Sequence, residues 1–154
     1  NLTKCDNLAS TFSNCTNLTT INMPNLVEGT VGSMAFYNCR ALQTIDLKIS
    51  TSNYYNYMFS NCISLTKVKA PLATINATCF NKCSILRTLI LPQSNTAATL
   101  ESSTAFNDTL IGKNQNSGIY VPRVLLNDYK TATNWVTLSN YIYAIEDYPD
   151  ITGG

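Results

Sequence analysis

Six cysteines are the residues of this chain best suited to chemistry, because a thiolate can act as a nucleophile or bind a metal. Nucleophilic catalysis by a thiol usually needs a neighbouring general base, most often histidine. The chain has no histidine, so Cys-His and Ser-His systems are excluded. Zinc is also disfavoured, because Cys79 and Cys83 form the only local pair and no histidine can complete a site. We therefore predict no metal and no cofactor.

The acidic residues could supply the two carboxylates that glycoside hydrolysis requires. They fall in different parts of the chain without a convergent motif: Glu28, Asp46, Glu101, Asp108 and Glu146. No phosphate-binding loop, dinucleotide-binding glycine pattern or calcium-binding loop is present. We predict that the chain is not an enzyme, with a carboxylate hydrolase as the minor alternative.

The phenylalanines and cysteines recur in one phrase, Phe-x-x-Cys-x-x-Leu-x-x-Ile-x-Leu, which is nearly complete in four copies. The phenylalanines are spaced by 24, 23, 21 and 26 residues: Phe12, Phe36, Phe59, Phe80 and Phe106. The cysteines at the shared position are Cys15, Cys39, Cys62 and Cys83. A fixed period of about 20 to 50 residues indicates a solenoid, whose turns pack on one another. The phrase therefore predicts inward ladders of phenylalanine, cysteine and leucine.

Each phrase ends in alternating apolar residues, which is the periodicity of a β-strand. We predict short parallel strands at residues 21–23, 45–47, 68–70, 89–91 and 119–121. Proline directly follows four of them, where its missing N–H ends a strand without disturbing the middle. The stretches before the cysteines are predicted to form short helical or irregular turns on the opposite side.

The cysteine ladder admits two interpretations. Neighbouring strands lie about 4.8 Å apart, so adjacent sulfurs could meet the distance limits of a disulfide. A small buried thiol can instead fill a tight bend and donate weakly to a backbone carbonyl. We favour free structural thiols over bridges, with Cys79 as a further small core residue.

The repeat stops at Pro122, and the residues beyond it follow another pattern. Residues 123–133 carry apolar side chains at helical spacing: Leu125, Leu126, Tyr129 and Ala132. Residues 141–145 then alternate like a last strand. Because terminal repeats must seal an open core, we predict about five repeats at residues 1–121, the first truncated, and a cap and tail at 122–154. The sequence begins inside a phrase, so we expect it to be a segment of a longer chain.

The composition limits the partners. Charged residues make up 12% of the chain and the net charge is +1, with no basic cluster of the kind that binds nucleic acid or anionic membranes. No apolar run approaches the length of a transmembrane helix. We predict no nucleic-acid partner and no membrane insertion.

Solenoids bind through their extended curved face, so the outward residues of the predicted strands are candidates for binding. These candidates are Asn22, Asp46, Lys69, Ile90 and Tyr120, with Lys67 beside them. A second candidate interface is a tyrosine cluster ahead of the third phenylalanine: Tyr54, Tyr55 and Tyr57. The alternatives are that the strand residues are ordinary polar surface and that the tyrosines pack on the core.

The four phrases, together with the ending Ile119-Tyr-Val-Pro122 and Trp135, resemble the BspA-like leucine-rich-repeat family over roughly residues 5–148. The resemblance implies an α/β fold: a right-handed leucine-rich-repeat solenoid with short parallel strands, an irregular or short-helical convex side and a C-terminal helical cap. It also implies a secreted or surface-attached protein, often involved in adhesion, and related cassettes occur in phage proteins.

Taken together, these patterns favour a non-catalytic recognition module of an exported or cell-surface bacterial protein. Such a module would bind a protein or glycan partner in adhesion. The alternative is a structural spacer or assembly repeat within a larger surface or phage virion protein.

Overall fold

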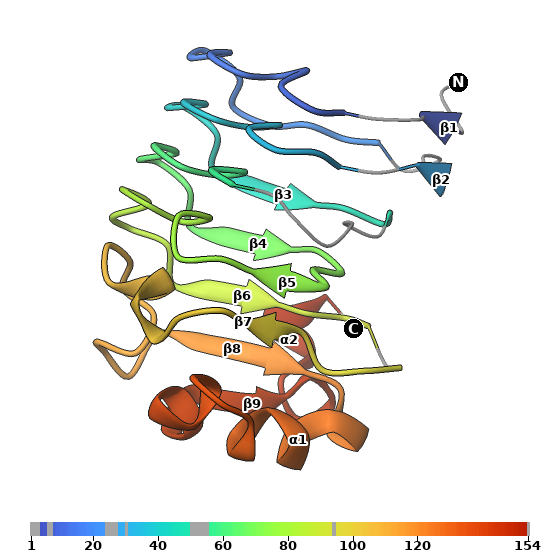
Figure 1. The fold of residues 1–154 in the computed structure, drawn as a ribbon, viewed down its shortest axis with the longest axis vertical. Coiled ribbons are helices and arrows are strands. Elements are labelled where there is room, and N and C mark those ends of the chain that lie inside the picture. Colours follow the sequence, from blue (N-terminus) through green and yellow to red (C-terminus); the bar gives the residue numbers. More distant parts are fainter. Residues whose placement is uncertain are drawn as a thin grey trace.

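The structure, a computed structural model, describes residues 4–5, 8–23, 28–29, 31–49, 56–93 and 95–153. Its main element is a parallel sheet of five strands in the order β3-β4-β6-β8-β9 (Figure 1). These strands are β3 (Thr44–Asp46), β4 (Lys67–Lys69), β6 (Thr88–Ile90), β8 (Gly118–Val121) and β9 (Ile142–Ala144). Each successive turn of the chain adds one strand, so neighbours in sequence are neighbours in the sheet.

Two further parallel pairs, which the sequence did not predict, lie on another side of the turns. They are β1 (Lys4–Cys5) with β2 (Glu28–Gly29), and β5 (Thr74–Ile75) with β7 (Thr99–Leu100). Each of these strands has two residues, too few for an alternating pattern to be recognised. In Figure 1, β5 and β7 lie in front of the five-stranded sheet.

The helical elements are short and gather toward the C-terminal end. They are the 3₁₀ helices η1 (Ser103–Phe106), η2 (Arg123–Leu125), η3 (Trp135–Tyr141) and η4 (Ile145–Asp147), and the α-helices α1 (Leu126–Thr131) and α2 (Pro149–Thr152). The helix predicted at residues 123–133 is therefore confirmed as η2 running into α1. None of the helices among the described residues is long and apolar enough to cross a membrane.

Four predicted strands are confirmed with small shifts, and one is wrong. β3, β4 and β6 start one residue before the predicted ranges, and β8 does likewise. Residues 21–23 do not form the predicted strand; only a single bridge from Thr20 to Thr44 joins this turn to the sheet. The turn pairs through Thr19, whose carbonyl accepts from Gln43, so its backbone bonds lie nearer the start of the phrase than the alternation indicated. The last predicted strand is confirmed as β9.

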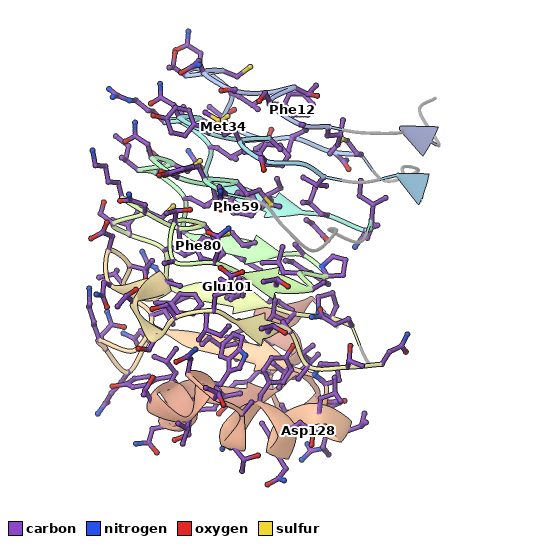
Figure 2. All side chains as sticks on the ribbon, in the orientation of Figure 1. Phe12, Met34, Phe59, Phe80, Glu101 and Asp128 are labelled. Carbon is purple, nitrogen blue, oxygen red and sulfur yellow. The ribbon has the colours of Figure 1, made fainter. Side chains whose placement is uncertain are left out.

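The phenylalanine ladder is confirmed as one stack through the molecule. The ring centroids of Phe12, Phe36, Phe59, Phe80 and Phe106 follow one another at 5.4, 5.5, 5.6 and 5.6 Å. The first three pairs are parallel to within 4°. Figure 2 shows Phe12, Phe59 and Phe80 one below another inside the stack. Buried aromatic area on this scale dominates the energetics of a core.

An asparagine ladder accompanies the phenylalanines and was missed in the sequence. Asn38 donates to Asn14 at 2.9 Å, and Asn61 donates to Asn38 at 2.5 Å. All three have positive φ, at 63°, 60° and 65°, a region that asparagine tolerates better than most residues. The signal was available, because asparagine stands directly before the cysteine in three of the phrases. In the fourth phrase Lys82 takes the positive φ, and its backbone N–H donates to Asp108.

The residues after Pro122 contact the small sheet that contains β7. The Trp135 indole donates to the Ala98 carbonyl at 2.7 Å, and the Ala98 N–H donates to the Tyr129 hydroxyl at 2.8 Å. The Asn134 side chain donates to the Leu100 carbonyl at 2.8 Å. Side chains after Pro122 thus satisfy backbone groups of β7 and of the residue before it.

Candidate functional site

The candidate site lies on the strand face, by which we mean the side of the five-stranded sheet turned away from the phenylalanine stack. Ile45, Val68 and Leu89 point into the core. The residues on either side of each of them in its strand therefore occupy the strand face. At the N-terminal half of this face is a groove of about 390 Å³. Its lining residues are Ile21, Asn22, Thr44, Ile45, Asp46, Lys67, Lys69 and Gly153.

The groove combines both signs of charge with neutral polar groups. Strand register sets Thr44 beside Lys67 and Asp46 beside Lys69. Asp46 also forms an ion pair with Lys48 at 2.9 Å, with both side chains about half exposed. Asn22, Thr44 and Asp46 are exposed, whereas Lys67 and Lys69 are half-buried. The structure therefore brings four predicted candidates together: Asn22, Asp46, Lys67 and Lys69.

The expectation that Ile90 and Tyr120 belong to an exposed face is wrong. Ile90 is fully buried and Tyr120 is only 6% exposed. Both follow Lys69 in the register of the sheet, so they do lie on the strand face. Tyr120 is covered because the chain returns over this half of the face after β9 and places Tyr148 against it. Alternation along a strand predicts which side a residue faces but does not reveal that the side is covered.

Three tyrosines form the covered end of the face. The ring of Tyr120 lies 5.7 Å from that of Tyr143 and 5.4 Å from that of Tyr148, and the latter two are 5.3 Å apart. Gly118 makes room for them, because a Cβ there would come within 2.9 Å of the Tyr143 ring. Burial first, and then the neighbouring tyrosines, raises the pKa of Tyr120, which favours the neutral phenol.

Of the predicted tyrosine cluster ahead of Phe59, the structure describes Tyr57 alone. Tyr54 and Tyr55 lie outside the described residues. Tyr57 is 40% exposed, has a φ of 59° and donates its backbone N–H to the Thr78 hydroxyl. Tyr57 is not among the residues that line the groove.

The structure resolves the two interpretations in favour of free thiols at the five cysteines whose side chains it describes. Each of three thiols donates to the phenylalanine carbonyl of the preceding turn: Cys39 to Phe12, Cys62 to Phe36 and Cys83 to Phe59, at 3.0–3.1 Å. In the fifth turn the Thr109 hydroxyl bonds to Phe106 of its own turn instead. Cys79 is buried as predicted, whereas Cys15 is exposed.

We expect these buried thiols to resist alkylation in the folded chain. Burial raises the pKa of Cys39 to about 11 and that of Cys83 to about 12, and it also raises the pKa of Cys62 and Cys79. At about pH 8, N-ethylmaleimide should modify Cys15 and leave these four unmodified until denaturant is added, because only the thiolate reacts. Peptide mapping by mass spectrometry measures this, with Cys15→Ser as the control. Rapid labelling of Cys62 in the folded chain would contradict the ladder.

No three of the Cys, Asp and Glu side chains among the described residues gather closely enough to hold a metal ion. The acidic residues named as a possible catalytic set stay dispersed where the structure describes their side chains. Asp46 pairs with Lys48, Asp108 accepts from the Lys82 backbone, and Glu146 accepts from the Arg123 backbone. The arrangement on the strand face is suited to binding by hydrogen bonds and charge.

Comparison with known proteins identifies the repeat. A family model described as the BspA-type leucine-rich-repeat region matches residues 8–113 in six copies. This range covers well over half of the 154 residues. No curated protein and no solved structure matches the chain.

Proposed function

Because the chain belongs to the BspA-type leucine-rich-repeat family, we propose that it is a recognition module that binds a protein or glycan partner through the open groove of its strand face. The carrying observation is the groove itself, where Asn22, Asp46, Lys67 and Lys69 converge beside an uncovered half of the sheet. The groove offers both hydrogen-bond donors and hydrogen-bond acceptors, which can bind either a peptide backbone or sugar hydroxyls.

We further propose that the module belongs to an exported or cell-surface bacterial protein that takes part in adhesion. Its low share of charged residues and near-neutral net charge support a partner recognised by shape and hydrogen bonding, because such a surface offers little long-range electrostatic attraction. The family resemblance supports the location.

We also propose that residues 122–153 are the C-terminal cap of a right-handed solenoid. The bonds of Trp135, Tyr129 and Asn134 to the strand β7 and the residue before it support the capping role. The right-handed winding is supported by the general rule for parallel strands joined by a crossover within one sheet.

The test of the groove starts from a screen of the chain on glycan and extracellular-matrix protein arrays. A variant with Asn22→Ala, Asp46→Ala and Lys69→Ala should bind the identified partner at least about tenfold more weakly, since truncating central interface residues commonly costs more than about 1 kcal/mol each. The matched control replaces the same residue types on α1: Asn127→Ala, Asp128→Ala and Lys130→Ala. It should bind like the unaltered chain.

Equal affinity of the groove variant and the α1 variant would overturn the proposal. A chain that binds nothing on the arrays but self-associates in sedimentation experiments would favour the spacer or assembly function. That alternative has one specific observation behind it. Among the described residues, Phe12 stacks on a ring at one side only and Cys15 is exposed.

A further inference from the structure

The C-terminal segment, residues 148–153, lies on the strand face and occupies one end of it. Lys67, a strand-face residue of β4, donates through its ammonium group to the Ile151 carbonyl at 2.5 Å. Gly153 lines the groove together with Lys67 and Lys69. In Figure 1 the helix α2 of this segment lies behind the five-stranded sheet, opposite β5 and β7. The segment therefore forms part of the wall of the groove, through Gly153.

The segment covers apolar surface that does not belong to the main core. Ile90 and Tyr120 are buried, yet neither is part of the continuous cluster that contains the phenylalanine stack. The Tyr148 ring covers Tyr120 and meets it nearly edge to face, at 69°. Beneath the segment there is consequently a small apolar and aromatic platform on a face that is otherwise polar.

The segment is less deeply buried than the residues before it. Tyr148 and Ile151 are each 37% exposed, whereas Tyr129 and Trp135 are almost completely buried. α2 has four residues, and its flanking backbone bonds are local, from Ile151 to Tyr148 and from Gly153 to Pro149. Regions with few buried contacts and exposed backbone open at the lowest free-energy cost. This segment is thus the part of the strand face best able to detach.

Its charge complements the surface that it covers. Asp150 is the one acidic residue of residues 148–153, and the groove that the segment borders is lined by Lys67 and Lys69. Arg123 pairs with Asp147, and its backbone N–H donates to Glu146, which anchors the start of the segment and leaves the remainder to the strand face. Two contacts hold the segment on the strand face: the Tyr148 ring lies against Tyr120 and Tyr143, and the Lys67 ammonium group donates to the Ile151 carbonyl.

We propose that residues 148–153 are an intramolecular ligand of the strand face, and that the same surface binds a tyrosine-bearing peptide segment of a partner protein when residues 148–153 detach. This inference rests on the proposed function, and it names the class of partner and the means of regulation. The partner's tyrosine takes the place of Tyr148 against Tyr120 and Tyr143, and a partner carbonyl takes the place of Ile151 at Lys67. Gly118 supplies the space that the aromatic rings require.

Competition follows from this arrangement. A tethered ligand has a high effective concentration, so it lowers the apparent affinity of any free peptide for the same surface. The apparent affinity for the free peptide is the intrinsic affinity multiplied by the fraction of molecules in which the surface is open. Loosening residues 148–153 should therefore strengthen the binding of a free peptide. If these residues were only a structural element, loosening them would weaken that binding.

The experiment uses the full chain and a fluorescent peptide with the sequence of residues 145–154, followed by fluorescence anisotropy. A loosened variant, Tyr148→Ser with Ile151→Ser, should bind the peptide at least about tenfold more tightly than the unaltered chain. The matched control, Val124→Ser with Val136→Ser, replaces two exposed apolar residues outside the groove and should bind as the unaltered chain does. A peptide with serine in place of its tyrosine should bind neither protein.

A second pair of variants tests where the peptide binds. Adding Lys67→Met to the loosened variant should reverse the gain, whereas adding Lys130→Met on α1 should leave it intact. Equal peptide affinity of the loosened and unaltered chains, with circular dichroism showing both folded, would overturn the inference. It would leave the proposed function standing if the Asn22, Asp46 and Lys69 variant still lost its array partner.

Hydrogen exchange keeps the inference testable should the loosened variant fail to fold. In the otherwise unaltered chain, Lys67→Met should speed amide exchange in residues 148–153 relative to Lys130→Met. No difference between these two variants would show that Lys67 does not hold the segment, and the inference would fail.

Discussion

Replacing Trp135 with alanine is expected to lower the free energy of unfolding by about 3 to 5 kcal/mol, the range for a large aromatic residue removed from a core. Trp135 is 1% exposed and extends the phenylalanine stack, 6.1 Å from Phe106. Its ring also receives Tyr129 edge-on at 5.1 Å, and its indole N–H satisfies the Ala98 carbonyl. The substitution removes all three contacts and leaves a buried cavity. Equilibrium unfolding in urea, followed by circular dichroism, measures the change.

Two further variants separate the parts of this effect. Trp135→Phe keeps most of the ring but leaves the Ala98 carbonyl without its donor, which should cost about 1 to 3 kcal/mol. Val136→Ala changes the adjacent residue, whose side chain is 54% exposed, and should alter stability by less than about 0.5 kcal/mol. If Trp135→Ala were no worse than Val136→Ala, the residues after Pro122 would not contribute to sealing the stack.

Phe59→Ala is expected to cost a similar amount, about 3 to 5 kcal/mol, because it opens a gap in the middle of the aromatic stack. The Phe59 ring is fully buried between Phe36 at 5.5 Å and Phe80 at 5.6 Å. Neighbouring turns are also joined at this residue, since its carbonyl accepts from the Cys83 thiol. Thermal and urea unfolding of the variant measure the loss.

Phe12→Ala is the matched control for position in the stack. Phe12 has one described ring neighbour, Phe36, and is only half-buried, so the same chemical change should cost clearly less than at Phe59. Equal losses at the two positions would contradict the idea that stability comes from stacking between successive turns. The comparison isolates the ladder because the residue type and its place in the phrase are the same.

Much of the architecture could be predicted because the repeat imposes the same environment on each copy. The spacing of Phe12, Phe36, Phe59, Phe80 and Phe106 was enough to predict the stack, and alternation placed β4 and β6 to within one residue. The thiols followed from the same reasoning, since a residue repeated at a core position of a solenoid faces its counterpart in the next turn. Four of the strand-face candidates were found in this way.

The remaining features depend on segments that meet only after folding. The two-residue strands β5 and β7 have no periodicity of their own, and they exist because successive turns set their backbones side by side. Residues 21–23 carry the strand pattern but have a neighbouring turn on one side only among the described residues, and they make a single bridge. Alternation of apolar residues indicates which side chains face the core if a strand forms. A strand forms only where a neighbouring backbone segment is available for hydrogen bonding.

The sequence by itself determined the family, the stack of aromatic rings, the buried thiols and the face on which binding residues should be sought. Only the tertiary structure decided which part of that face is open. Tyr120 has the same outward register as Asp46 and Lys69, yet it is covered by Tyr148, which follows it by tens of residues. The physical reason is that alternation is a local property of a strand, whereas coverage depends on the path by which a distant segment returns.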